Sequence, residues 1–190
     1  MLNCKSCSFF RAYFGVILFT AVAVRFFPQF ASLSLPLILV GVPVFLFGKT
    51  PSELGYRNYL NGLLWGLGVS LIVLPVYYVG APHKLPFDFE KLVSVIPFYL
   101  GVAVGEETFF RGFFYSVFEN EKLFGILTKN NLLSSVLFGV AHALVYYDPS
   151  RFIVFFPSLV MGFLYERSGS IVAPILFHFL SDLTFQFARV

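Results

Sequence analysis

Two adjacent glutamates and an arginine stand in an apolar stretch in the middle of the chain. The segment VAVGEETFFRGFFYSVF, residues 102–118, holds Glu106, Glu107 and Arg111 among mostly Val, Phe and Gly. On a helix, Glu107 and Arg111 are four residues apart and share a face, so they can form an ion pair. Glu106 is turned by about 100° from that face, which leaves its carboxylate free. Such a carboxylate can act as a general base toward water.

Two histidines and an aspartate supply the further groups that such a base needs. His142 lies in SVLFGVAHALVYY and His178 in PILFHFLSDLTFQF, each in the middle of an apolar stretch. Asp182 follows His178 by four residues, so it can accept a hydrogen bond from one ring nitrogen and fix the tautomer of the ring. Phe138 precedes His142 by four residues and can pack under its ring. One carboxylate and two imidazoles can supply the base, the oxyanion donor and the acid that peptide hydrolysis requires.

The composition indicates that apolar helices position these groups. The chain has 190 residues, of which 58% are hydrophobic and 12% are charged, and its mean hydropathy is +0.82, whereas a soluble domain is about 25% charged. A bilayer-crossing helix needs about 20 mostly apolar residues. We therefore expect an all-α, polytopic integral membrane bundle of about seven transmembrane helices, at residues 9–27, 30–47, 59–80, 92–116, 131–147, 152–166 and 170–188.

Short polar connections separate the expected spans, so sequential helices should be neighbours in one membrane domain over residues 1–190. Ionisable side chains within a span are costly unless they are paired or hydrated. Apart from Arg11 and Arg25 near the ends of the first span, they are confined to the last four spans. We therefore expect residues 92–190 to form the catalytic core and residues 1–91 to form scaffold helices. A small excess of Lys and Arg on the N-terminal side favours a cytoplasmic N-terminus.

Each of these residues also has a structural interpretation. A single buried histidine is more often a hydrogen-bonded bundle residue than a catalyst, and Glu107 with Arg111 is more often a structural ion pair. Asp182, near the end of the chain, could simply face water. Because six costly groups are confined to four consecutive spans, their conjunction favours chemistry over any of these single interpretations.

Other chemistries find less support in the sequence. Cys4 and Cys7, in NCKSCS, could bind a metal or form a redox pair, but structural zinc sites use four ligands and no second pair is present in the chain. Ser134, Ser135 and Ser181 stand in no Gly-x-Ser-x-Gly elbow, so we expect no covalent serine mechanism. The net charge of +3 comes without a basic run, and we expect no nucleic-acid partner.

Taken in order, the three groups of residues resemble the motifs of a known family. Glu-Glu-x-x-x-Arg at residues 106–111, Phe-x-x-x-His at 138–142 and His-x-x-x-Asp/Asn at 178–182 are similar to those of the CPBP family of intramembrane endopeptidases, also known as the Abi family. That family includes the CAAX prenyl endopeptidases and bacterial proteins linked to bacteriocin self-protection. The resemblance covers residues 92–190, and its specificity lies in three motifs in the right order on expected membrane helices.

The resemblance implies a glutamate-dependent peptidase whose active site opens into the membrane. Glu106 would match the glutamate that activates water, and His142 its partner in holding that water. Glu107 and Arg111 would match the supporting pair.

The same resemblance gives the last motif a role at the oxyanion. His178 and Asp182 would match the groups that bind the oxyanion of the tetrahedral intermediate. The eukaryotic prenyl endopeptidases usually have Asn where this chain has Asp182. Position 182 therefore either donates to the oxyanion or orients His178.

We expect the partners to be the lipid bilayer and a membrane-anchored protein or peptide substrate, cut near its C-terminal or membrane-embedded part. The short chain looks like the compact bacterial members, so we expect a multi-pass protein of the prokaryotic inner membrane. The sequence predicts no particular oligomeric state. An apolar groove for the substrate is one interpretation of the aromatic residues around the glutamates, and bundle packing is the other: Phe109, Phe110, Phe113, Phe114 and Tyr115.

We expect no cofactor and no bound metal. Zinc is the alternative, because Glu and His are also zinc ligands, although the His-Glu-x-x-His arrangement is absent from the sequence. Two other functions fit a buried cluster of this kind: a proton-coupled transporter, and a non-catalytic membrane binding or immunity protein. A Glu106→Gln variant separates them from a protease, which should lose all of its activity.

Overall fold

Helices make up most of this computed structural model, which describes residues 4–189 and, within them, the side chains of residues 6–30 and 34–188. The helices are α1 (Cys4–Phe26), α2 (Pro28–Gly41), α3 (Tyr59–Gly80), α4 (Phe89–Glu107), α5 (Phe114–Val117), α6 (Lys129–Tyr146), α7 (Phe155–Ser168) and α8 (Val172–Phe187). A π-helical turn, Val42–Leu46, extends α2, and a 3₁₀ segment, Pro149–Val154, leads into α7.

Two short antiparallel strand pairs link segments outside the helices. Strand β1 (His83–Lys84) pairs with β4 (Ala188–Arg189), and this pairing ties the loop after α3 to the end of α8. Strand β2 (Lys122–Phe124) pairs with β3 (Leu127–Thr128) in the hairpin that joins α5 to α6. These strand pairs are small, so the predicted all-α class holds.

Helical structure lies over every one of the seven expected spans. In the part of the chain that the structure describes, three helical segments are long and apolar enough to cross a membrane: Ser6–Phe26, Tyr59–Gly80 and Phe89–Val117. Two shorter apolar segments, Ser34–Leu46 and Val172–Phe187, accompany them. The membrane-type helical bundle is therefore confirmed, whereas the count of seven crossings stays a prediction.

The sequence predicts one continuous helix over residues 92–116, whereas the observed helical segment changes its winding after Glu107. Helix α4 ends at Glu107, a π-helical turn follows over Thr108–Phe113, and α5 completes the segment. Wide turns of this kind are frequent at functional sites in helices. Apolar periodicity alone does not reveal such a turn, because the residues on both sides of it remain helical and buried.

Side-chain caps and backbone conformation set the ends of the helices that carry the site. Asp88 accepts from the backbone N–H of Lys91 at the start of α4, and Thr128 accepts from that of Asn131 at the start of α6. These are the expected N-cap contacts of a short polar side chain. Helix α7 ends at Ser168 and is capped by Gly169, whose φ of 63° suits glycine because it has no Cβ.

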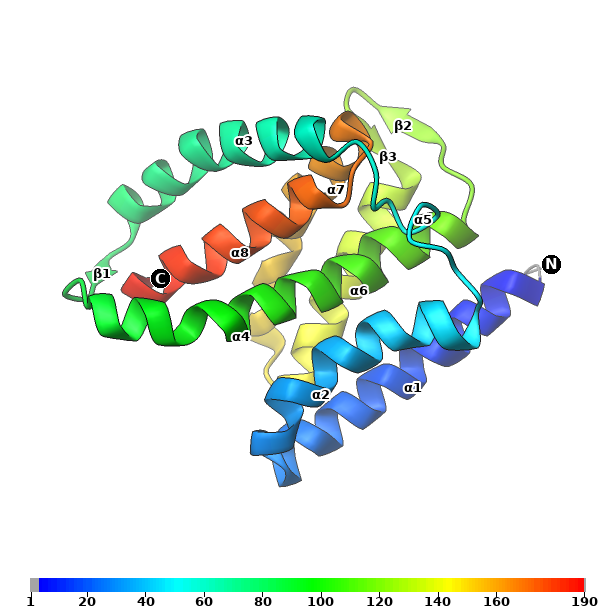
Figure 1. Ribbon diagram of the computed structural model, residues 1–190, viewed down its shortest axis with the longest axis horizontal. Coiled ribbons are helices and arrows are strands. Elements are labelled where there is room, and N and C mark those ends of the chain that lie inside the picture. Colours follow the sequence, from blue (N-terminus) through cyan, green and yellow to red (C-terminus); the bar gives the residue numbers. More distant parts are fainter. Residues whose placement is uncertain (1–3, 190) are drawn as a thin grey trace.

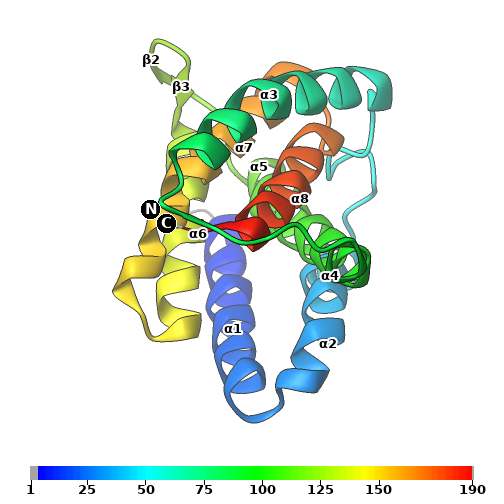
Figure 2. The same cartoon turned by 90° about the vertical axis from the view of Figure 1, so that its left-hand side faces the viewer.

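The arrangement in space places α8 at the centre of the bundle (Figure 1). Helix α8 packs on α3, α4 and α7, and α6 packs on α7 and α1. Helices α1 and α2 form a hairpin that projects from the rest of the molecule (Figure 2), and α2 contacts α4. Helix α4 thus packs on α8, and α6 packs on the π-helical turn that follows α4.

An aromatic core fixes α1 against the segment that follows the glutamates. Phe9 is fully buried and its ring contacts those of Phe109, Phe113 and Phe114. Phe110 is buried as well, against the ring of Phe138. These side chains pack against one another, and Phe110 also lines a small cavity beside Glu106. Packing is therefore shown for them, and a substrate groove stays a prediction.

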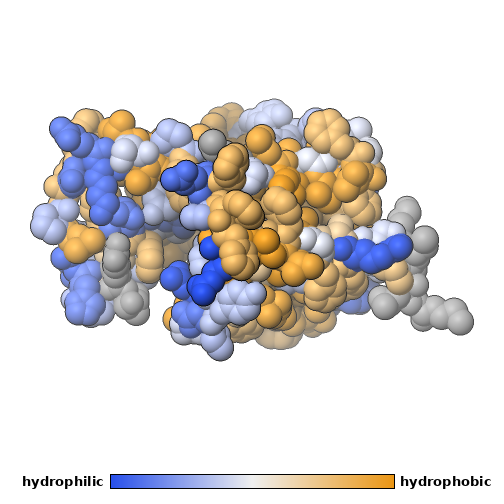
Figure 3. Space-filling view, turned by 90° about the horizontal axis from the view of Figure 1, so that it is seen from below, coloured by the Kyte–Doolittle hydropathy of each residue, from blue (hydrophilic) through white to orange (hydrophobic). Residues whose placement is uncertain are grey.

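The outer surface carries many exposed apolar side chains. On α3 they include Leu60, Leu64, Leu71, Ile72 and Val79, each more than 60% exposed. Hydrophobic residues cover the middle of the face shown in Figure 3, and hydrophilic residues gather at the end of the molecule that carries β1. This distribution suits a protein that is surrounded by lipid.

Cys7 lies in α1 as a free thiol. The side chain of Cys4 lies outside the described ones. The structure therefore does not test metal or redox chemistry at this pair.

Candidate active site

Helices α4, α6 and α8 bring one carboxylate between two imidazoles. Oε2 of Glu106 lies 3.9 Å from Nε2 of His142 and 3.8 Å from Nε2 of His178. Asp182, one turn after His178, places its Oδ2 3.6 Å from the same Nε2. The structure therefore brings together Glu106, both histidines and Asp182, which are the residues that the spacing placed on three different helices.

Glu107 holds the other side of the cluster. Its Oε1 accepts from Nη1 of Arg111 at 3.0 Å, and both side chains are fully buried. The same oxygen accepts from Nδ1 of His178 at 2.8 Å. The expected Glu107–Arg111 ion pair is present, and Glu107 also binds a catalytic candidate directly.

This contact corrects the expected role of Asp182. The sequence suggested that Asp182 fixes the tautomer of His178, but its distance of 3.6 Å is too long for a hydrogen bond. Glu107 takes that place, because an Nδ1 that bonds to a carboxylate carries the proton. A contact between residues 71 positions apart could not be read from spacing along one helix.

His142 is oriented by its own helix. Its Nδ1 lies 3.0 Å from the carbonyl oxygen of Phe138, so this nitrogen donates and Nε2 faces Glu106 with its lone pair when the ring is neutral. The rings of Phe138 and His142 lie 4.4 Å apart, as the spacing predicts. Phe138 also contacts His178 edge-on, at 5.9 Å between ring centres, so it packs against both imidazoles.

Arg111 reaches two further residues, one of which the motifs do not include. Its Nη2 donates to the backbone oxygen of Ser158 at 2.9 Å and to Oγ at 2.5 Å. Its Cζ lies 5.1 Å from the centre of the Phe138 ring, within range of a cation–π contact. Ser158 was missed from the sequence because a lone serine in an apolar span gives no signal until its partner is known.

Some atoms of the cluster lack partners within the described part of the chain. Oε2 of Glu106, Oε2 of Glu107 and Nε of Arg111 are buried there without a hydrogen bond. Buried polar atoms are nearly always satisfied, and exceptions often mark functional positions. For Glu106 the unpaired atom is the one that faces both imidazoles.

A small cavity of about 60 Å³ opens beside Glu106 and His142. One wall comes from α1 and α2, through Ile17, Thr20 and Leu39 among others, and the opposite wall includes Tyr146. The wall from α1 and α2 is apolar except for Thr20. The site therefore faces the helical hairpin that lies outside the expected catalytic core.

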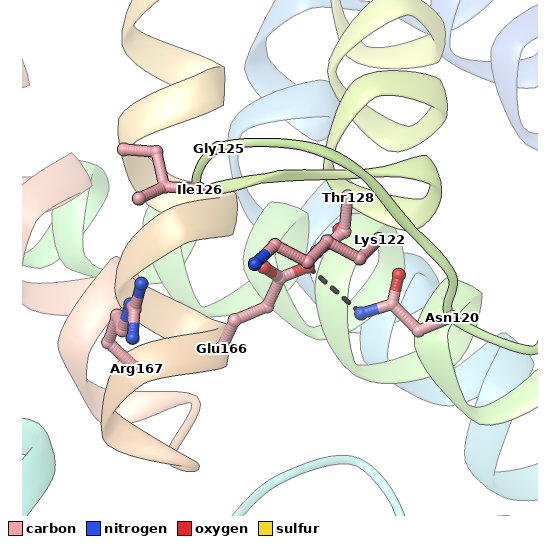
Figure 4. Close-up of a pocket in the computed structure, with 7 residues that line it drawn as sticks. All are labelled: Asn120, Lys122, Gly125, Ile126, Thr128, Glu166 and Arg167. Carbon is pink, nitrogen blue, oxygen red and sulfur yellow. Dashed lines mark hydrogen bonds between the residues drawn. The ribbon is translucent and has the colours of Figure 1, made fainter.

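A larger hollow, of about 340 Å³, lies elsewhere, between the β2–β3 hairpin and the end of α7 (Figure 4). Its lining includes Lys122, Glu166 and Arg167 and none of the predicted site residues. Oε1 of Glu166 accepts hydrogen bonds from Asn120, Tyr115 and Thr128, which tie α7 to the neighbouring segments. These contacts explain Glu166 as a structural residue.

No set of three or more His, Cys, Asp or Glu side chains within the described residues is arranged to hold a metal ion. Whether the protein depends on a metal stays a prediction for experiment.

Fold and site together define a polytopic helical membrane protein in which carboxylates and imidazoles from three helices form one cluster. Residues 88–184, just over half of the chain, match the family described as Type II CAAX prenyl endopeptidase Rce1-like. The chain belongs to this family, which confirms the resemblance drawn from the motifs. No curated protein and no solved structure matches the chain.

Proposed function

We propose that the protein is a glutamate-dependent intramembrane endopeptidase of the CAAX-protease type. The observation that carries this proposal is the position of Glu106, whose buried Oε2 faces Nε2 of both His142 and His178. Membership of a family of CAAX prenyl endopeptidases supports the reaction class.

Glu106 and His142 are suited to hold and activate a water molecule. Separations of 3.8 and 3.9 Å are too long for direct hydrogen bonds and suit a bridging water. One O–H of this water points to Glu106 and the other to Nε2 of His142, so a lone pair is left for attack. Glu106 takes the proton as the water oxygen bonds to the substrate carbonyl carbon. It then returns the proton to the amine nitrogen as the C–N bond breaks.

His178 and Asp182 are suited to support the oxyanion. Because Nδ1–H of His178 is bound to Glu107, its Nε2 is the nitrogen that faces the site. When this nitrogen carries a proton, it can donate to the negative oxygen of the tetrahedral intermediate. Asp182 lies beside it at 3.6 Å and, in its protonated form, can donate to the same oxygen.

The substrate in this proposal is a protein cut near its C-terminal or membrane-embedded part. The cavity beside Glu106 has an apolar wall from α1 and α2, which suits an apolar chain that arrives from the bilayer. Its volume of about 60 Å³ is far below the roughly 300 Å³ of a usual ligand pocket. The α1–α2 hairpin therefore has to shift when a peptide binds. A prokaryotic inner membrane stays the expected location of the protein.

Cleavage by the purified protein tests this proposal. Detergent-purified wild type is incubated with a farnesylated peptide that ends in a CAAX sequence and with an unprenylated apolar tail peptide. Glu106→Gln should lower the cleavage rate by about 100-fold or more. Glu90→Gln is the matched control, because Glu90 is an exposed residue in the first turn of the same helix.

The same assay with a chelator addresses the metal. The proposed mechanism uses only side chains of the chain, so activity should stay unchanged after chelation. If the chelator abolishes activity and added zinc restores it, the mechanism depends on a metal, and the proposed metal-free activation of water by Glu106 is wrong. Equal cleavage by wild type and Glu106→Gln would refute the proposal as a whole.

A further inference from the structure

Ser158 is a buried polar residue that belongs to none of the three motifs. It lies in the first turns of α7, and its side chain is inaccessible to solvent. Both of its oxygens accept from the same atom, Nη2 of Arg111, at 2.9 Å for the backbone oxygen and 2.5 Å for Oγ. A hydrogen bond to a charged donor in a buried place is among the stronger ones in proteins.

Arg111 needs this second anchor because its contact with Glu107 is made through one nitrogen only. Nη1 donates to Oε1 at 3.0 Å, while Nε of Arg111 and Oε2 of Glu107 have no hydrogen-bond partner among the described residues. An arginine–carboxylate pair with two parallel hydrogen bonds would fix both groups. A single hydrogen bond leaves the carboxylate free to turn unless the guanidinium is held from elsewhere. Ser158 holds it, with the face of Phe138 on one side.

The orientation of Glu107 in turn decides that of His178. The oxygen that accepts from Arg111 also accepts from Nδ1 of His178 at 2.8 Å. A rotation of this carboxylate would turn the imidazole and move its Nε2 away from Glu106, which lies 3.8 Å from it. The contacts thus form one chain from α7 to the site: Ser158, Arg111, Glu107 and His178.

We propose that Ser158 is a positioning residue, which sets the ring orientation of His178 through Arg111 and Glu107. Its effect on catalysis rests on the proposed peptidase function, whereas its effect on the His178 ring does not. Ser158→Ala removes Oγ and leaves the backbone oxygen, the helix and nearly all of the packing in place. The variant therefore weakens the anchor without deleting a group of the reaction.

Histidine NMR tests the positioning directly. The chain has three histidines, so protein labelled with ¹⁵N-histidine in detergent micelles gives few ring signals, which single His variants assign. In Ser158→Ala the ring signals of His178 should shift, and its Nδ1 proton should exchange faster with water. The signals of His83, in the exposed strand β1, should not move.

Ser168→Ala is the matched control for this experiment. Ser168 lies at the end of the same helix, is equally buried, and donates from Oγ to the carbonyl of Leu164 at 2.7 Å. The hydrogen bonds of its side chain within the described part of the chain join it to Leu164 and Ser170, and none joins it to Arg111. The control should leave all histidine signals in place, although it too loses a buried hydrogen bond.

Kinetics with the farnesylated peptide give the second readout. Ser158→Ala should lower kcat by about tenfold, the size usual for a residue that orients a catalytic ligand. KM should change by less than about twofold, because Ser158 does not touch the substrate. Unmoved His178 signals in Ser158→Ala, or equal shifts in Ser168→Ala, would overturn the positioning role. A wild type that cleaves no peptide would refute the proposed function alone, since the NMR comparison decides the role of Ser158 without it.

Discussion

Glu106 and Glu107 are neighbours in the sequence, and their carboxylates have different surroundings. Glu107 is fully buried and bound to Arg111 and His178, whereas Glu106 is partly accessible and faces two imidazole nitrogens at longer range. This difference follows from the 100° turn between successive helical residues. Glu107 is therefore held in an ion pair, and the carboxylate of Glu106 stays free to take a proton.

Position 182 gives a sharp test at the residue scale. An amide donates to an oxyanion as well as a protonated carboxyl does, so Asp182→Asn should keep its activity within about fivefold of wild type. Asp182→Ala lacks the donor and should lose about 100-fold in kcat. Steady-state kinetics on the farnesylated peptide measure both. If the Asn and Ala variants are equally inactive, the carboxylate is required and the donor role is wrong.

The buried ion pair gives a second prediction, this time for stability. Arg111→Met leaves Glu107 buried without its charged partner, so the free energy of unfolding should fall by about 3 kcal/mol. Lys129→Met is the control, because Lys129 and Glu121 form an exposed pair that is worth less than about 1 kcal/mol. Denaturant unfolding in detergent measures both. Similar losses for the two variants would contradict a buried pair at Arg111.

At the scale of elements, the positions of the helices could be predicted from the length of the apolar stretches and from the short polar segments between them. The sequence also put each pair of site residues on one helical face, because spacing of four fixes that geometry. It could not give the partner of His178 Nδ1 or the anchor of Arg111, since Glu107 and Ser158 reach them from other helices. The π-helical turn after Glu107 was missed for a related reason: backbone widening leaves no mark on hydropathy.

The close packing of α2 on α4 leads to a prediction for these two helices. A Cβ on Gly105, the residue before Glu106, would lie 2.8 Å from the Cα of Pro36. Gly105→Ala should therefore push the two helices apart, cost about 1–3 kcal/mol of stability and lower activity. Gly68→Ala on α3 is the control, because nothing lies within 4 Å of its added Cβ. Thermal unfolding and kinetics report both effects, and a neutral Gly105→Ala would show that the helices are not packed this closely.

At the scale of the whole molecule, we expect the candidate span Phe89–Val117 to cross the membrane. Strand β1 lies at one end and the β2–β3 hairpin toward the other (Figure 1), with the apolar segment Phe89–Val117 between them. The candidate site lies inside this bundle, and α1 and α2, outside the matched residues 88–184, line its cavity. The scaffold helices are therefore part of the site.

This orientation predicts the accessibility of the loops. In a background without Cys4 and Cys7, cysteines placed at Lys84 and Lys122 should react with a membrane-impermeant reagent from opposite sides of the membrane. Both positions are exposed, and one candidate span separates them. Labelling of intact cells and of inverted vesicles measures the side of each. If both cysteines react from the same side, Phe89–Val117 does not cross the membrane as proposed, and the seven-span arrangement is wrong.

The most direct test of the central claim is mass spectrometry of protein C-termini in the source membranes. Wild type, Glu106→Gln and the control Glu90→Gln are expressed at matched levels. If Glu106 activates the attacking water, the Glu106→Gln membranes accumulate longer precursors that wild type and control have cut at a shared position. Identical C-termini in all three membranes would contradict a peptidase that depends on Glu106.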